Sequence, residues 1–535
     1  MLLTALSCQL VFNGYSTLLV PLRPTLSRID FQVKPMSASV TIPLLAFAAC
    51  FLLTRVMRMV AMRFGIVDAP DGRRKLQRKA IPLGGGVGIC LSIQLALAIS
   101  LALPGAPDLF SNYVAGLLIA VNMIVVIGLT DDRFQLRGRQ KLVGQTVTSL
   151  VLVLSGLVVQ RIQVFSWHIE LGLLSVPFTM LWLVGAMNAL NLIDGIDGLA
   201  TGVGIILSLA IAGMAVMTGH PTDAMMAMAL CGALLGFLVY NFPPASIYLG
   251  DAGSMLIGLM LGALAIRCSL KGPATVALAA PSVIWTIPMF DVGMAILRRK
   301  LTGRSIYETD RGHLHHCLLR QGFSNRTTLI WVGAFCSCTA AGALLSIACQ
   351  NEWLAVGSAL AVVCTLVLTR WFGHAECLLL GRRLQGLVMS LIQMPGSSEK
   401  LARQPVRDRL TGTRDWDELW DTLTVFAEQF DLSSVQLNVN LPAMNEEYHV
   451  NWERRERGPQ LEEWFTDLPL VSNNVTIGRL RIRGHCSQGS VCTWMGDLIA
   501  GLKPFETQML SLIVDRADND DQKHLNQTVT PVTAG

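Results

Sequence analysis

The sequence predicts an all-α polytopic membrane protein of about 11 transmembrane helices, followed by a small cytoplasmic α+β domain. Of its 535 residues, 52% are hydrophobic and 15% are charged, and the mean hydropathy is +0.50. This composition is too apolar for a soluble enzyme. The apolar residues also gather in segments of roughly 18 or more, the length that a helix needs to cross a bilayer. Composition and segment length therefore place most of the chain in lipid.

Eleven segments are expected to span the membrane. They run approximately from 39 to 61, 83 to 103, 112 to 130, 143 to 160, 170 to 187, 200 to 217, 224 to 241, 250 to 267, 274 to 297, 328 to 348 and 351 to 370. The segment 1–38 begins with the short apolar stretch MLLTALSCQL, which lacks the basic start of a signal peptide and is followed by Arg23, Arg28 and Lys34. A start near Met36, a partial twelfth span and an amphipathic anchor stay open for this segment.

The charges of the loops predict the orientation. Loops that follow the odd-numbered spans share one face and hold seventeen Lys and Arg, whereas the opposite loops hold three: Arg161, Arg267 and Lys271. Basic loops stay in the cytoplasm. We therefore expect the seventeen-residue face and the C-terminus to be cytoplasmic, with the protein in the cell inner (cytoplasmic) membrane.

The chain changes character after about residue 380, where the composition becomes that of a soluble protein. We expect the transmembrane domain to cover 39–380, a linker 381–414, an α+β domain 415–515 and a disordered tail 516–535. Periodicity predicts helices in DWDELWDTLTVFAEQF and MGDLIAGLKPFETQMLSLIV and strands in SVQLNVNL and VTIGRLRIRG.

Five aspartates lie at membrane ends on the predicted cytoplasmic face: Asp131, Asp132, Asp194, Asp197 and Asp251. An ionised carboxylate at the centre of a bilayer costs about 2.5–3.5 kcal/mol, so acids at this depth are normally paired, solvated or functional. The loops after the fifth and seventh spans contain no Lys or Arg that could balance them. A metal ion is the natural partner, and plain solvation of loop acids is the alternative.

The stretch NALNLIDGIDGLA, 188–200, spaces Asn188, Asn191, Asp194 and Asp197 by three. Steps of three drift around an α-helix, whereas a tighter turn at Gly195 and Gly198 would bring these side chains together. Asparagine both donates and accepts hydrogen bonds, which suits a nucleobase or a sugar. Aspartate supplies hard oxygen for magnesium.

The stretch IYLGDAGSM, 247–255, sets Asp251 between Gly250 and Gly253. Glycines let the backbone approach a phosphate or a metal closely. Magnesium typically takes one or two carboxylates together with phosphate oxygens and water, so the acidic residues suit a diphosphate site.

The stretch DRGHLHHCLL, 310–319, supplies His313, His315 and His316 in the most basic loop. These histidines and the arginines nearby, Arg298, Arg299, Arg304 and Arg311, suit binding of phosphate oxygens. A zinc site with Cys317 is disfavoured because the ligands are crowded along the chain, and a purely structural role is the other alternative.

Four ordered motifs, GLTDDRFQL, NALNLIDGIDGLA, IYLGDAGSMLIG and DRGHLHH, resemble the polyprenyl-phosphate N-acetylhexosamine-1-phosphate transferases, glycosyltransferase family 4, over roughly residues 40–370. The stretch RRKLQRKAIPLGGG resembles the first cytoplasmic loop of the family, but Gln77 stands where the family usually has histidine. The HxHH motif preceded by Asp-Arg resembles the branch that uses UDP-N-acetylglucosamine more than the muramyl-pentapeptide branch. The resemblance does not extend to the C-terminal segment.

The resemblance implies transfer of a sugar 1-phosphate from a UDP-sugar to undecaprenyl phosphate, with release of UMP and with Mg²⁺ (or Mn²⁺ in its place) as cofactor. It assigns Asp251 to Mg²⁺, Asp131 to accepting a proton from the lipid phosphate and Asp132 to supporting that site. It makes Asn191 and Asp194 polar active-site residues, Asp197 a uracil contact and Tyr248 an aromatic residue that stacks on the base.

Other residues enter as substrate-binding candidates on charge and position. Asn188 suits a nucleobase or sugar, and Lys75, Lys79 and Lys141 are candidates for the acceptor phosphate. Arg299 and Arg304 are expected to join His313, His315 and His316 on phosphate oxygens. A cation-coupled transporter is the alternative from another class, but it would place acids at several depths and repeat broken helices in both halves. A homodimer and a partner or ligand of the C-terminal domain stay open, and no nucleic-acid partner is expected.

Overall fold

A computed structural model describes residues 36–68, 80–102, 110–165, 167–272, 275–277, 279–301, 312–378, 380–381, 384, 406–411, 416–441, 446–454, 463–472, 475–485, 498, 500–505 and 507–509. Lys75, Lys79, Arg304 and Arg311, most of the segment 1–38 and the tail 516–535 lie outside these residues.

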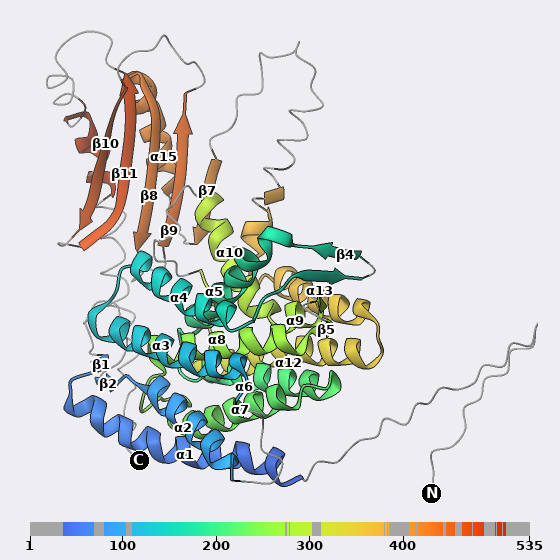
Figure 1. The fold of residues 1–535 in the computed structure, drawn as a ribbon. Helices are drawn as coiled ribbons and strands as arrows, with labels where there is room; N and C mark the ends of the chain where they lie inside the picture. Colours follow the sequence, from blue (N-terminus) through green and yellow to red (C-terminus); the bar gives the residue numbers. More distant parts are fainter. Residues whose placement is uncertain are drawn as a thin grey trace, which may run out of the picture.

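Helices form most of the described membrane part (Figure 1). They are α1 (Met36–Arg63), α2 (Gly85–Ser100), α3 (Asn112–Phe134), α4 (Gly138–Leu154), α5 (Ser175–Ile193), α6 (Leu199–Met217), α7 (Pro221–Asn241), α8 (Gly250–Cys268), α9 (Ala279–Ile284), α10 (Thr286–Leu301), α11 (Leu314–Arg320), α12 (Asn325–Ala348) and α13 (Glu352–Leu368). Within the described residues, seven helices are long and apolar enough to cross a membrane, and α2 and α13 are apolar but shorter. The chain is a multi-pass membrane protein.

Two of the expected spans differ from the helices that form. The segment 274–297 is divided at Trp285 into α9 and α10. Pro288 explains the break, because a proline ring clashes with the carbonyl four residues earlier, which here is the last residue of α9. The segment 143–160 ends early: α4 stops at Leu154, and Gly156 follows with a φ of 97°, a conformation that terminates helices.

Helix α8 lies in the middle of the helical body (Figure 1), with 89% of its apolar stretch buried. Glycines on neighbouring helices allow this. A Cβ added at Gly86 of α2 would lie 2.3 Å from Gly253 N, and one at Gly128 of α3 would lie 2.3 Å from Ala252 Cα. Small residues let helix backbones approach closely in membranes. The N-terminus of α8 is thereby held against α2 and α3.

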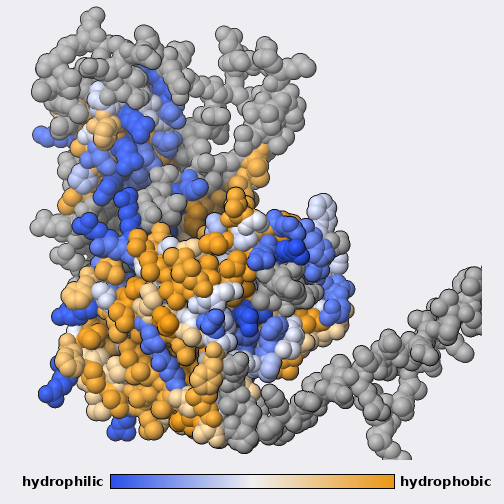
Figure 2. Space-filling view, in the orientation of Figure 1, coloured by the Kyte–Doolittle hydropathy of each residue, from blue (hydrophilic) through white to orange (hydrophobic). Residues whose placement is uncertain are grey.

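The outside of the helical body is apolar, as a surface facing lipid requires. Figure 2 shows hydrophobic residues over much of this surface, and Leu181, Val126 and Ile330 are 71%, 62% and 68% exposed.

Two small sheets join loops of the helical body. β1 (Val67–Asp68) pairs with β2 (Ile81–Pro82) at the two ends of the first predicted cytoplasmic loop. β3 (Arg161–Val164), β4 (Trp167–Glu170), β5 (Leu270–Gly272) and β6 (Thr275–Ala277) form a sheet of order β4-β3-β6-β5 from two loops of the other face. These strands were not predicted from the sequence, because each has four residues or fewer.

The C-terminal segment contains a five-stranded antiparallel sheet of order β10-β11-β8-β9-β7. Its strands are β7 (Val406–Thr411), β8 (Leu432–Leu441), β9 (Glu446–Glu453), β10 (Glu463–Ser472) and β11 (Val475–His485), and α15 (Trp416–Gln429) packs on it. Trp416 and Trp420 of α15 share a buried cluster with Val435 and Leu437 of β8. The domain boundaries drawn from the sequence stay a prediction.

Candidate active site

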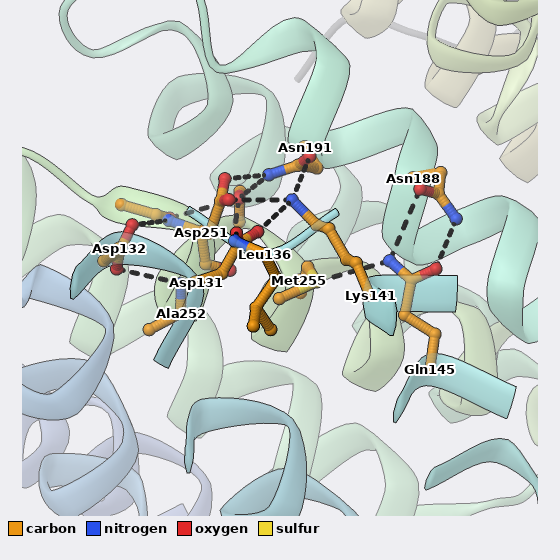
Figure 3. Close-up of polar contacts among 12 residues, drawn as sticks. Asp131, Asp132, Leu136, Lys141, Gln145, Asn188, Asn191, Asp251, Ala252 and Met255 are labelled. Atoms are coloured by element: carbon orange, nitrogen blue, oxygen red, sulfur yellow. Dashed lines mark hydrogen bonds and ion pairs between the residues drawn. The ribbon is translucent and has the colours of Figure 1, made fainter. Parts of the chain in front are cut away.

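Residues from four helices meet beside the N-terminus of α8 (Figure 3). They are Asp131 and Asp132 from the last turn of α3, Lys141 and Gln145 from α4, Asn188 and Asn191 from α5, and Asp251 from the first turn of α8. Segments separated by more than a hundred residues thus supply one polar group at the end of apolar helices.

The ammonium group of Lys141 lies at the centre of this group. Its Nζ is 2.7 Å from Oδ2 of Asp251, 3.0 Å from Oδ2 of Asp131 and 3.0 Å from Oδ1 of Asn191. Asn191 also donates from Nδ2 to Oδ1 of Asp251 at 2.5 Å and to Oγ of Ser254 at 2.9 Å. Both carboxylate oxygens of Asp251 therefore have a partner.

Asp132 and Asp131 have different hydrogen-bond partners. Its Oδ1 accepts from the backbone N–H of Asp251 at 2.8 Å, and its Oδ2 accepts from that of Ala252 at 3.4 Å. These are two of the N–H groups that the start of a helix leaves without a partner in the helix. Gly250, with a φ of 73°, makes room for the carboxylate, since an added Cβ would lie 2.6 Å from Asp132 Oδ2. Asp131 instead accepts from the N–H of Leu136 at 2.8 Å and faces Lys141.

The four polar residues spaced by three do not share one set of partners. Asn191 joins the Lys141 cluster, but Asn188, one turn earlier on α5, exchanges hydrogen bonds with Gln145 at 2.8 and 3.3 Å. Gln145 is buried and was not singled out from the sequence. The drift of side chains around the helix thus carries Asn188 to a different partner from that of Asn191.

The turn between α5 and α6 carries Asp194 and Asp197. Oδ2 of Asp197 accepts from the N–H of Ala245 at 2.8 Å, and the buried Asn241 accepts from the N–H of Gly198 at 3.1 Å. Gly198 has a φ of 75°, which favours glycine there. Burial raises the pKa of Asp194 well above its usual range, and the carboxylates of Asp251, Asp132 and Asp197 raise it further.

Tyr248 connects this turn to the first loop. Its backbone N–H donates to Pro82 O at 2.9 Å, and its carbonyl accepts from the N–H of Gly85 at 3.1 Å. Burial raises the pKa of its phenol to about 12, and Asp197 and Asp68 contribute to the shift. The two residues that the resemblance assigns to the base, Asp197 and Tyr248, are therefore near each other.

The histidines begin at α11, and Asp291 of α10 fixes the first of them. Nδ1 of His313 lies 2.9 Å from Oδ2 of Asp291, while Oδ1 of Asp291 accepts from the N–H of Leu314 at 2.8 Å. Asp291 is 1% exposed. A buried carboxylate on one ring nitrogen orients the imidazole and leaves its Nε2 for another partner.

A buried ion pair holds the start of the same turn. Arg298 donates from Nε to Glu376 Oε1 at 2.5 Å and from Nη2 to the carbonyl of Gly312 at 2.8 Å. Both side chains of the pair are buried. Arg298 belongs to the basic loop predicted from the sequence, whereas Asp291 and Glu376 were not singled out from it.

His315 lies against the turn between α5 and α6, which carries Asp194 and Asp197. A Cβ added at Gly195 would lie 2.0 Å from Nε2 of His315, so the ring rests on the turn that carries Asp194. Burial lowers the pKa of His315 well below its usual range, as do His316 and His313. The ring of His316 lies 4.2 Å from that of His315, measured between centroids.

The oxygens around Lys141 fit a hard cation. Asp251, Asp131 and Asn191 each direct one oxygen at the same positively charged atom. In the described part of the chain, no three His, Cys, Asp or Glu residues form a metal site by themselves. Magnesium rarely needs such a cage, because it is held by one or two carboxylates, phosphate oxygens and water. The oxygens present therefore fit Mg²⁺ that a diphosphate helps to bind.

Comparisons with known proteins give the same family as the four motifs. The sequence model described as "Glycosyl transferase family 4" matches residues 114–269. The chain is 32% identical over 282 residues to a probable undecaprenyl-phosphate N-acetylglucosaminyl 1-phosphate transferase of Bacillus subtilis (strain 168), covering 52% of this chain and 76% of the relative. It is 32% identical over 362 residues to decaprenyl-phosphate N-acetylglucosaminephosphotransferase of Mycolicibacterium smegmatis, covering 63% of this chain and 88% of the relative. Phospho-N-acetylmuramoyl-pentapeptide-transferase of Shouchella clausii is 32% identical over 296 residues, which cover 52% of this chain and 88% of that protein.

Proposed function

The chain belongs to glycosyl transferase family 4, and we propose that it transfers N-acetylglucosamine 1-phosphate from UDP-N-acetylglucosamine to undecaprenyl phosphate. UMP leaves, and a lipid-linked diphosphate sugar that initiates a cell-envelope polysaccharide remains. The observation that carries this proposal is the convergence of Asp131, Asp251, Asn191 and Lys141 at the end of membrane helices. A lipid anchored in the bilayer can present its phosphate only at such a boundary.

The reaction proposed is a single displacement. An oxygen of the lipid phosphate forms a bond to the sugar-linked phosphorus, and the bond from that phosphorus to the oxygen of UMP breaks. The second pKa of a phosphate monoester is about 6, so the nucleophile is largely ionised at neutral pH. Asp131 then serves chiefly to position the acceptor phosphate rather than to remove a proton.

Mg²⁺ held by Asp251, with Asp131 and Asn191 in reach, would neutralise charge on the diphosphate. The side chains of the turn 312–316 supply donors for phosphate oxygens, with His313 oriented by Asp291. Arg299 is proposed to assist there by its charge. Fixed donors of this kind stabilise charge that develops in the transition state.

We propose that this site faces the cytoplasm, where UDP-sugars are present, and that the protein resides in the cytoplasmic membrane. The proposal rests on the basic loops beside the site. It places eleven spans in the bilayer, with α2, α4, α13 and the α9–α10 pair as the shorter ones, and puts the five-stranded sheet on the cytoplasmic side. The homodimer and the partner of the C-terminal domain stay predictions.

Two alternative functions are considered: transfer from a muramyl-pentapeptide nucleotide, and transport. Because the relative from Shouchella clausii is named a phospho-N-acetylmuramoyl-pentapeptide-transferase, the muramyl-pentapeptide nucleotide is included as a donor in the assay below. A transporter is disfavoured, because the acids of the site gather at one end of α3, α5 and α8 rather than at several depths.

The assay measures UMP release by the purified full-length protein in detergent with Mg²⁺ and undecaprenyl phosphate. UDP-N-acetylglucosamine, UDP-N-acetylgalactosamine and the muramyl-pentapeptide nucleotide are compared, with Asp251→Asn as the control. We expect release from UDP-N-acetylglucosamine that needs lipid, Mg²⁺ and Asp251. Faster release from another donor would replace the donor, and release from none by folded protein would contradict the proposal.

A further inference from the structure

The position of Lys141 has a consequence for how a cation enters this site. Its ammonium contacts Asp251, Asp131 and Asn191 at 2.7 to 3.0 Å, and its side chain is 15% exposed. The side chain of Asp131 is 8% exposed and that of Asp251 is 32% exposed. Two carboxylates thus share one positive charge in a place that water reaches only in part.

A divalent cation cannot join this arrangement without changing it. Oδ2 of Asp251 is held by Lys141, and Oδ1 is held by Asn191 Nδ2 at 2.5 Å. Mg²⁺ needs its oxygen ligands at about 2.0–2.1 Å and in near-octahedral directions. A doubly charged ion at that distance would also lie within a few ångströms of the ammonium, where like charges repel strongly in a partly dry site.

We propose that Lys141 and the divalent cation exchange places at these carboxylates: the ammonium neutralises Asp131 and Asp251 until the cation binds, and is then released toward a substrate phosphate. This inference rests on the proposed function. The lysine side chain suits it, because its compact charge sits on a flexible four-carbon stem. Lys141 projects from α4, so it can turn away without moving the helices that carry the three oxygens.

Removal of Lys141 and removal of Arg139 distinguish the exchange from a general effect of positive charge on metal binding. Arg139 lies two residues before Lys141 on α4 and is exposed. Removing either side chain takes away one positive charge near the site. Only removal of Lys141 takes away a group that the cation must displace.

The test measures binding of Mn²⁺ alone to the full-length protein in detergent at pH 8 without substrates, by electron paramagnetic resonance of free Mn²⁺ and by calorimetry. Lys141→Met and Lys141→Gln are compared with wild type and with Arg139→Met. We expect each Lys141 variant to bind Mn²⁺ about tenfold more tightly or better, because no ammonium competes. Arg139→Met should change the dissociation constant by less than about twofold, since exposed charges are screened. Size-exclusion chromatography identifies which Lys141 variants are folded, and either one suffices.

Unchanged or weaker Mn²⁺ binding by a folded Lys141 variant would overturn the exchange, as would equal tightening by Arg139→Met. Absence of Mn²⁺ binding in all variants would overturn it as well. These outcomes are separate from the proposed function. Wild-type protein that releases UMP while its Lys141 variants bind Mn²⁺ no more tightly disproves only the exchange, whereas wild-type protein that releases no UMP disproves the function.

Discussion

Asp132 at the end of α3 caps the N-terminus of α8, its Oδ1 accepting a hydrogen bond from the backbone N–H of Asp251 at 2.8 Å. An anionic side chain there meets free N–H groups and the positive end of the helix dipole. The contact fixes the first turn of α8, and with it the side chain proposed to bind Mg²⁺. The two adjacent aspartates of α3 therefore have different roles: Asp131 faces Lys141, and Asp132 positions Asp251.

Replacing Asp132 should reduce activity through the position of Asp251. We expect Asp132→Ala to lower kcat by about 10- to 100-fold, as loss of a residue that supports a metal ligand does, and to destabilise the protein by about 1 kcal/mol through loss of the cap. Asp132→Asn keeps an acceptor and should retain most of the stability. UMP release and thermal unfolding measure the two effects. Full activity in Asp132→Ala would show that the cap does not position Asp251.

A methyl group at Gly195 should displace His315. The added Cβ would lie 2.0 Å from Nε2 of the ring, so the ring must move by more than 1 Å to reach ordinary contact. Displacements of that size can cost about 100-fold in rate, and we expect Gly195→Ala to lower kcat by about 10- to 100-fold. Gly185→Ala on α5 is the matched control, because its Cβ would meet only Met289 Cε at 3.5 Å. If both variants keep wild-type kcat, the contact between His315 and the turn is not needed.

Asp291 should act through the ring of His313. Asp291→Asn keeps an oxygen for the N–H of Leu314 but removes the negative charge beside Nδ1. We expect kcat to fall by about 10- to 100-fold while the midpoint of thermal unfolding changes little. Asp291→Ala should lose both activity and stability, because it leaves buried polar groups without a partner. Equal losses of stability in the two variants would assign Asp291 a structural role alone.

The raised pKa of Asp194 predicts a dependence of stability on pH. Above the pKa of an unfolded aspartate, near 3.9, the unfolded chain loses its proton while the folded protein keeps it. Stability is therefore lost as pH rises from that value toward the folded pKa. Asp194→Asn removes this loss, so its unfolding midpoint should exceed that of wild type. The difference between the two midpoints should grow by about 1–2 °C from pH 5 to pH 8. Thermal unfolding at several pH values measures it, and a constant difference would contradict the shift.

The grouping of the acids could be predicted because it follows from simple rules. Asp131, Asp194 and Asp251 lie at ends of apolar segments whose parity places them on one face. The loops at Asp194 and Asp251 contain no Lys or Arg to balance them. Asp251 and Asn191 do lie together in the structure. Of the two arrangements open for 188–197, the helical drift holds for Asn188, because a regular helix continues to Ile193 and carries this side chain toward Gln145.

The partners of these residues could not be predicted, because they depend on contacts between distant segments. Charge and position make Lys141 a candidate for the acceptor phosphate, but nothing in the sequence places it between Asp131 and Asp251. Asp291 offered one signal, an acid within an apolar segment, which is costly unless it is paired. Glu376 lies beyond the last expected span and offered none.

Mass spectrometry of the lipid product tests the central claim most directly. Wild-type protein is incubated with undecaprenyl phosphate, Mg²⁺ and UDP-N-acetylglucosamine, and the lipid and the released nucleotide are both identified. Transfer of the sugar 1-phosphate predicts a lipid diphosphate bearing N-acetylglucosamine together with an equal amount of UMP. A lipid monophosphate sugar with UDP, or unchanged lipid in the presence of folded protein, would contradict the account.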